Sequence, residues 1–271
     1  MPVSRRGSSR REVPWWLLAI VLLGVLTLWA IVADRDYADI FTALSGGIFT
    51  TLWVTFVAFF FALLLGLVVA LARTARLRLL REIATFYIEI IRGIPILVAL
   101  FYIAFVGAPW LVEAVNFVGA PLINAGLVAP LSIRTLDFTW RAILALTVCY
   151  SAFIAEVIRA GIEGVEPGQV EAAEALGLPR WPIFRLVVAP QALRIVLPPL
   201  GNDLVSMIKD SALVSALGVQ DITQLGKVYS SGTFKFFETY NVVAFLYLVM
   251  TISLSLLVKL LEARLRRRQK K

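Results

Sequence analysis

The sequence has no histidine and only one cysteine. Histidine is the commonest metal ligand and general base in proteins, so its absence disfavours a zinc, haem or histidine-based catalytic centre. Cys149 stands alone in an apolar stretch, which excludes a disulfide within the chain. No nucleophile–base pair is recognisable either. We therefore expect no catalytic residue, no metal site and no cofactor bound by this chain.

Charged residues are also scarce, at 16% of the 271 residues, whereas hydrophobic residues make up 60% and the mean hydropathy is +0.86. Soluble domains are only about half apolar. Here the apolar residues form long blocks with almost no charge, which is typical of membrane-spanning helices. The formal net charge of +8 comes from basic clusters between these blocks. Such clusters orient helices in a membrane, so we expect a lipid bilayer and not a nucleic acid as the surrounding partner.

The blocks predict an all-α integral membrane protein with about six transmembrane helices. They cover residues 15–33, 48–72, 84–106, 138–158, 186–208 and 240–261. The alternative for the first block is a signal peptide, because a basic segment also precedes it. We favour a span, since the block is longer than the usual core of about 7–15 residues and no clear A-x-A cleavage site follows.

Residues 110–131 are apolar enough to suggest a further span, which would reverse the topology of everything after them. They directly follow Pro109 and contain two further prolines and three polar side chains, so we interpret them as a re-entrant or folded external segment. With six spans and both termini in the cytoplasm, 20 Lys and Arg residues lie inside and 6 outside. This asymmetry follows the positive-inside rule and supports that topology.

The segment between the fourth and fifth blocks reads as a short capped helix. Pro167 suits a first helical turn, where its missing N–H is not needed. Gly177 suits the left-handed position that closes a helix, and Pro179 prevents continuation. Small apolar residues on such a helix suit docking into a groove of another protein. A solvated helix between two spans is the alternative interpretation from the pattern alone.

This segment resembles the E-A-A-x3-G-x9-I-x-L-P loop of the permease subunits of bacterial ATP-binding-cassette importers. The corresponding residues are Glu171, Ala172, Ala173, Gly177 and the run Val187-Val188-Ala189-Pro190. Val187 replaces the usual Ile and Ala189 replaces Leu. The resemblance implies that the loop is a coupling helix seated in a cleft of a cytoplasmic ATPase. The coupling-loop residues it implies are Gly168, Gln169, Glu171, Ala172, Ala173, Gly177 and Pro190.

Further motifs are similar to those of the polar amino acid permeases, of the histidine, glutamine, glutamate and arginine type. They are Thr50-Thr51-Leu52, Tyr87-x-Glu89-x-x-Arg92-Gly93-Ile94-Pro95, Ala155-Glu156-x-x-Arg159, Pro190-Gln191-Ala192-Leu193-Arg194, Pro198-Pro199-x-x-Asn202 and Lys209-Asp210-Ser211-Ala212-Leu213. The resemblance implies a five-helix type I importer core plus one N-terminal helix. It places a basic cytoplasmic N-terminus at 1–14, the extra helix at 15–33, a permease domain at 47–265 with the coupling loop at 159–189, and a basic tail at 266–271.

The same resemblance implies several partners: a cytoplasmic ATPase dimer, a second permease subunit, identical or homologous, and an extracytoplasmic amino-acid-binding protein. The chain lacks the motif G-x-x-x-x-G-K-[ST], and Gly226-Lys227 has neither the preceding glycine nor the following hydroxyl of a phosphate cradle. ATP and Mg²⁺ are therefore expected on the partner ATPase. The implied location is the bacterial cytoplasmic membrane, with several spans and both termini cytoplasmic.

Polar residues within the spans are candidates for the translocation pathway, because charges are usually kept away from lipid. They are Glu89, Arg92, Asn202, Asp203 and Ser206. The alternative for Glu89 and Arg92 is a structural ion pair, since they stand three residues apart on one helix. The alternative function is an ion-gradient-driven secondary amino acid transporter, which would need titratable groups near the membrane midplane, often in repeated halves.

Overall fold

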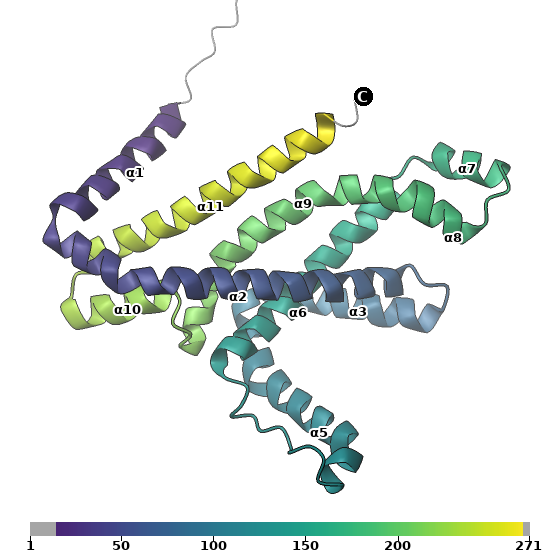
Figure 1. The fold of residues 1–271 in the computed structure, drawn as a ribbon, viewed down its shortest axis with the longest axis horizontal. Coiled ribbons are helices and arrows are strands. Elements are labelled where there is room, and N and C mark those ends of the chain that lie inside the picture. Colours follow the sequence, from purple (N-terminus) through teal and green to yellow (C-terminus); the bar gives the residue numbers. More distant parts are fainter. Residues whose placement is uncertain (1–14, 268–271) are drawn as a thin grey trace, which may run out of the picture.

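The computed structural model describes residues 15–267, and every regular element in that part of the chain is helical (Figure 1). The elements include two short π-helical segments, η1 and η2, and one 3-10 segment, η3. In chain order they are α1 Trp15–Ala33, α2 Arg35–Arg73, α3 Arg78–Gly93, α4 Ile96–Tyr102, η1 Ile103–Gly107, α5 Ala108–Asn124, α6 Phe138–Glu163, α7 Pro167–Ala175, α8 Arg180–Ile183, η2 Phe184–Val188, α9 Ala189–Asp210, η3 Ser211–Leu217, α10 Ile222–Thr233 and α11 Phe236–Arg267.

Five helical runs among the described residues are long and apolar enough to cross a membrane. With the apolar helix α1, whose bounds coincide with the predicted first block, they agree with the prediction of about six spans. The segments predicted at 1–14 and 268–271 lie outside the described residues. The first two residues of the predicted tail, 266 and 267, belong to the last turn of α11.

The third predicted span, residues 84–106, is not one continuous helix. The chain leaves the helix at Ile94, with φ −102° and ψ 137°, because a residue before proline is disfavoured in the helical region and Pro95 offers no N–H. A second helical run then extends over Ile96–Asn124, so most of the predicted folded segment 110–131 is helix. Figure 1 shows α5 projecting away from the other helices. That 110–131 does not cross the membrane stays a prediction.

The helix α6 is the centre of the packing and contacts α2, α3, α4 and α9. Of its most apolar window 61% is buried, against 39% or less for the other candidate spans. Glycines bring its neighbours close: a Cβ on Gly66 of α2 would lie 2.7 Å from Ile154, and one on Gly161 would lie 2.1 Å from Val196 of α9. Small residues at such crossings permit tight packing between helices in a membrane.

The two ends of the long helices differ. At one end of Figure 1 the short helices α7 and α8 project past the spans, and at the other α10 lies across the ends of α2 and α11. Asp221 holds α10 there: it is fully buried, and its carboxylate accepts bonds from the Gln224 N–H at 2.8 Å and the Tyr247 hydroxyl at 3.1 Å. Lys235 also pairs with Asp36 at 2.7 Å. The α10 end of the bundle is therefore closed by polar contacts between α2, α10 and α11.

Candidate functional site

The helix α7 has the caps that its sequence predicts. Pro167 occupies its first turn, and Gly177 follows its end in the left-handed region with φ +74°. The N–H of Gly177 donates to the carbonyl of Glu174 at 2.9 Å, and the N–H of Leu178 donates to that of Ala173 at 3.2 Å. This pair of bonds is the Schellman arrangement that ends helices at glycine. The nine-residue helix is thus closed by its own sequence.

One face of α7 is free in this chain. Among the described residues its main contacts are with α8 and η2, and Figure 1 shows it at the extreme end of the molecule. Leu176 is 81% exposed and Trp181 at the start of α8 is 68% exposed, although its ring stacks on Phe184 at 5.9 Å. Large apolar side chains grouped at an exposed surface mark a contact site for another protein or for a membrane. We define the coupling surface by its exposed members, Gly168, Gln169, Glu171, Ala172, Leu176 and Trp181.

Two of the predicted loop residues have other roles. Ala173 is buried and faces the rest of the chain, so it anchors α7 and does not contribute to its free face. Pro190 lies at the start of α9, away from α7 in sequence, directly after the π-helical segment η2. Trp181 was not among the residues predicted from the sequence. An isolated tryptophan beside a proline has no local pattern that distinguishes it from a tryptophan that faces lipid.

An ion-pair network joins the end of α2 to the end of α6 that precedes α7. Arg73 at the end of α2 pairs with Glu156 of α6, whose carboxylate also accepts a bond from Arg159 at 2.8 Å. Arg159 pairs in turn with Glu163 at 2.5 Å, four residues before α7 begins. The arginine and glutamate of the predicted Ala-Glu-x-x-Arg motif are therefore bonded to each other. The network fastens α2 to the part of α6 that leads into the coupling surface.

The predicted pathway residues fall on two helices. On α3, Arg92 places its guanidinium 5.7 Å from the ring centre of Phe153 in α6, which is a cation–π contact. None of the ion pairs among the described residues joins it to Glu89, so the structural ion-pair interpretation was wrong. Both side chains are exposed in the single chain.

The α9 candidates lie close to the same part of α6. Phe153 packs 6.0 Å from Tyr150, whose hydroxyl donates to Asp210 at the end of α9 at 2.7 Å. Asp203 is partly buried, and its Oδ2 has no hydrogen-bond partner among the described residues. Asn202 is exposed and Ser206, one helical turn away, is half-buried. We call Arg92 of α3 and Asn202, Asp203 and Ser206 of α9 the polar face.

The chemistry of this arrangement is that of a binding surface. Within residues 15–267 no group of three acidic or cysteine side chains is placed to hold a metal ion. The polar face offers a cation, a carboxylate, an amide and a hydroxyl, and the coupling surface offers apolar contacts. These are suited to binding a polar molecule and a protein partner, at two separate places joined by α6.

Comparison with known proteins gives one family. Residues 62–268 match the family described as "Binding-protein-dependent transport system inner membrane component". The chain is 37% identical over 227 residues to the probable glutamine ABC transporter permease protein GlnM of Bacillus subtilis (strain 168), covering 84% of this chain and 95% of that protein. It is 34% identical over 216 residues to the glutamine transport system permease protein GlnP of Escherichia coli (strain K12), covering 80% and 90%.

A solved structure agrees in sequence and fold. A crystal structure of an amino acid ABC transporter with histidines superposes with a TM-score of 0.71 at 35% identity, covering 84% of this chain and 97% of that one. An inward-facing structure of the MetNI methionine ABC transporter gives a TM-score of 0.65 at 22% identity, a likeness of fold alone. The helical core described above is thus shared with transporter subunits.

Proposed function

The chain belongs to the family of binding-protein-dependent transport system inner membrane components, and on that premise we propose that it forms the translocation pathway of an ATP-driven importer for polar amino acids. As a member of this family it is a permease subunit in the cytoplasmic membrane and not itself an enzyme. Among polar amino acids, glutamine is the first substrate to test, because two of the relatives are named for it.

The observation that carries the proposal is the coupling surface. A self-capped helix that projects beyond the spans and exposes Leu176 and Trp181 has the form of a docking element. Its partner is a cytoplasmic ATPase that binds ATP and Mg²⁺. Closing and opening of the two ATPase subunits selects between the outward and inward forms of the permease. The ion-pair network at Arg73 and Glu156 lies where such movement reaches the spans.

The polar face supports a second permease subunit, identical or homologous to this one. Arg92 and Asn202 are exposed in the single chain, Arg92 near the end of α3 and Asn202 within the candidate span that contains α9. A charge facing lipid near the middle of a membrane costs about 2.5–3.5 kcal/mol or more. A second subunit that covers this face removes that cost and encloses a polar path between the two chains.

The polar face also matches the charges of an amino acid. Its substrate carries an ammonium and a carboxylate, and the face provides the carboxylate of Asp203 and the guanidinium of Arg92. An external amino-acid-binding protein delivers the substrate at the α10 end of the bundle. Both termini are cytoplasmic in this arrangement, which the excess of Lys and Arg in the α7 loop and the tail supports.

The experiment is reconstitution of the chain with its ATPase in vesicles. We expect no hydrolysis by the permease alone and stimulation of the complex by glutamine-loaded binding protein. Trp181→Ala should reduce both ATPase co-purification and uptake, whereas Trp110→Ala, on α5, serves as the matched control and should change neither. Sustained uptake without nucleotide, driven only by an ion gradient, would instead support the secondary transporter, which the family assignment does not favour.

A further inference from the structure

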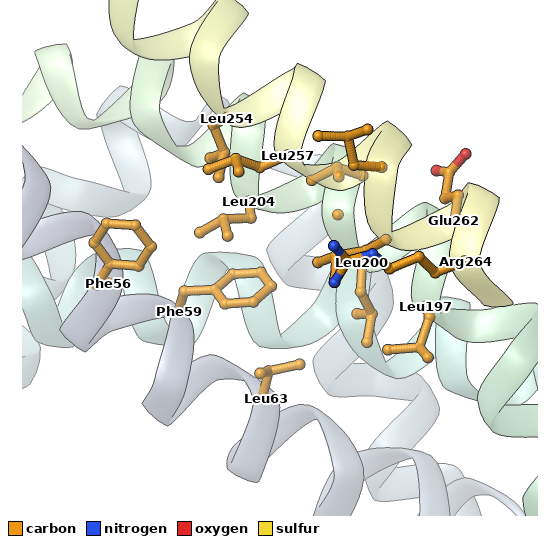
Figure 2. A pocket seen from close by; sticks show the side chains of 14 residues that line it. Phe56, Phe59, Leu63, Leu197, Leu200, Leu204, Leu254, Leu257, Glu262 and Arg264 are labelled. Atoms are coloured by element: carbon orange, nitrogen blue, oxygen red, sulfur yellow. The ribbon is translucent and has the colours of Figure 1, made fainter.

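A large hollow in the described chain lies on the side of α9 that carries Leu200 and Leu204. It is a cavity of about 1070 Å³ between α2, α9 and α11, and its walls are almost wholly apolar (Figure 2). Its sides come from Phe59 and Leu63 of α2, Leu200 and Leu204 of α9 and Leu257 of α11. At the bottom α9 and α11 touch, since a Cβ on Gly201 would meet Val258 at 2.4 Å. We call this hollow the groove.

The groove has the depth of one leaflet of a bilayer. Its wall on α11 extends from Leu254 to Arg264. Ten residues of α-helix rise about 15 Å, which is half of the roughly 30 Å hydrocarbon core. The Arg264 end is the end nearest the basic C-terminus of the chain, so it lies at the headgroup level of the cytoplasmic leaflet. The choice of leaflet rests on the proposed orientation of the permease.

A cation is placed at that end. Figure 2 shows the guanidinium of Arg264 turned into the groove beside Leu200, while the carboxylate of Glu262 at the rim points away from it. No ion pair involving Arg264 is formed among the described residues. A planar guanidinium above an apolar slot is suited to a phosphate oxygen whose attached chains enter the slot.

We propose that the groove binds a phospholipid of the cytoplasmic leaflet, with an acyl chain between α9 and α11 and its phosphate on Arg264. Leu257 and Leu261 are more than half exposed, so a lipid chain has free access from the side. The Arg264 end also stands next to the basic tail, which attracts anionic headgroups. The tail itself is a poor occupant, because five of the last six residues are Lys or Arg. Their charges are unsuited to the leucine-lined walls and are repelled by the guanidinium of Arg264.

The test measures bound lipid on the full-length chain in its assembled transporter. After delipidation in detergent, phosphatidylglycerol is added and retained lipid is counted by native mass spectrometry. Arg264→Gln should weaken retention about tenfold or more, the value expected for one charge-assisted hydrogen bond. Leu204→Trp, which fills the groove, should also release the lipid. Lys259→Gln is the matched control, since Lys259 is an exposed cation of α11 that does not line the groove.

Two results would overturn the proposal. The first is equal retention by wild type and Arg264→Gln, or equal retention of phosphatidylglycerol and of diacylglycerol, which lacks the phosphate. The second is a crosslink between two copies of a Cys149→Ser, Leu257→Cys variant, which would make the groove a contact between permease subunits. Because lipid retention is measured and not uptake, either result leaves the importer assignment standing.

Discussion

Arg73, the last residue of α2, forms an ion pair with Glu156 of α6, and both side chains are about four-fifths buried. The two residues stand far apart in sequence, on the two helices that contact each other most extensively. Glu156 also pairs with Arg159, and Arg159 pairs in turn with Glu163 at the end of α6. The end of α6 that leads into the coupling surface is therefore fastened to α2.

Removing one partner of this pair should be costly. Arg73→Ala leaves a partly buried carboxylate with one cation fewer, for which we expect a loss of about 1–3 kcal/mol and weaker coupling of ATP hydrolysis to uptake. The measurement is thermal unfolding in detergent together with the ratio of uptake to hydrolysis. Arg78→Ala is the control, because the Arg78–Glu82 pair is exposed at 85% and 61% and spans 3.7 Å. An equal effect of both variants would contradict a special role for Arg73.

Gly177 tests the shape of the coupling surface. Its φ of +74° costs other residues roughly 1 kcal/mol or more, although nothing lies within 4 Å of an added Cβ in this chain. We expect Gly177→Asn to be mild and Gly177→Val severe, since Asn tolerates the left-handed region and a branched residue does not. Gly177→Asp, which also adds a negative charge to this surface, should remain in the membrane at normal abundance but lose ATPase co-purification and uptake. Normal uptake by Gly177→Asp would refute the coupling role.

Neighbouring glycines of α2 provide a matched pair for packing at the opposite end. A Cβ on Gly47 would lie 2.6 Å from the backbone nitrogen of Ile222, whereas a Cβ on Gly46 would meet nothing within 4 Å. Gly47→Ala should therefore displace α10 and lower stability by about 1–3 kcal/mol. Gly46→Ala should be neutral or slightly stabilising, since Ala is the better helix former. The measurement is the melting temperature of each variant relative to that of wild type.

Asp221 should make the α10 end sensitive to pH. Burial raises the pKa of its carboxyl above the ordinary value of 3.8, against the lowering effect of the bonds from Gln224, Tyr247 and Thr223. The folded chain then holds this proton more tightly than the unfolded chain, so its contribution to stability falls as pH rises from about 4 through the raised pKa. Asp221→Asn removes the titration, and the melting temperature of wild type relative to Asp221→Asn should decline over that range. A difference that does not vary with pH would contradict the argument.

Reporter fusions test the topology. Fusions after residues 80 and 170 should report cytoplasm, and fusions after 135 and 230 the opposite side, because 110–131 does not cross in the predicted arrangement. The helical run Ile96–Asn124 is long enough to span, which makes the fusion after 135 the informative one. A cytoplasmic reporter there, with 170 outside, would invert the assignment and remove the coupling surface from its ATPase.

The features that could be read from the sequence are those fixed by near neighbours in the chain. Pro167 and Gly177 determine the ends of α7 within a few residues, and the uncharged run before Ala33 determines α1. The helix break at Pro95 could also have been predicted from the sequence, but the prediction gave more weight to the high hydropathy of residues 84–106. Proline before a long apolar run can be tolerated within a span, so composition alone did not resolve the choice.

The features that could not be read depend on contacts between distant segments. The partner of Arg92 is the ring of Phe153 and not Glu89 on its own helix, which local spacing favours. The pairing of Arg73 with Glu156 and the burial of Ala173 follow from the packing of α6 against its neighbours. The groove needs three helices from both halves of the chain, so no single stretch of sequence marks it.

The π-helical segment η2, Phe184–Val188, has a consequence for how the length of this loop can vary. A π turn contains one residue more than the α turn it replaces, so the chain between α7 and α9 carries one surplus residue. Deleting a residue within η2 lets the segment close as α-helix while α9 keeps its rotation. Deleting one inside α9 turns everything beyond it by about 100°. Relatives one residue shorter between the positions of Gly177 and Pro190 can therefore keep the same faces of α9 turned inward.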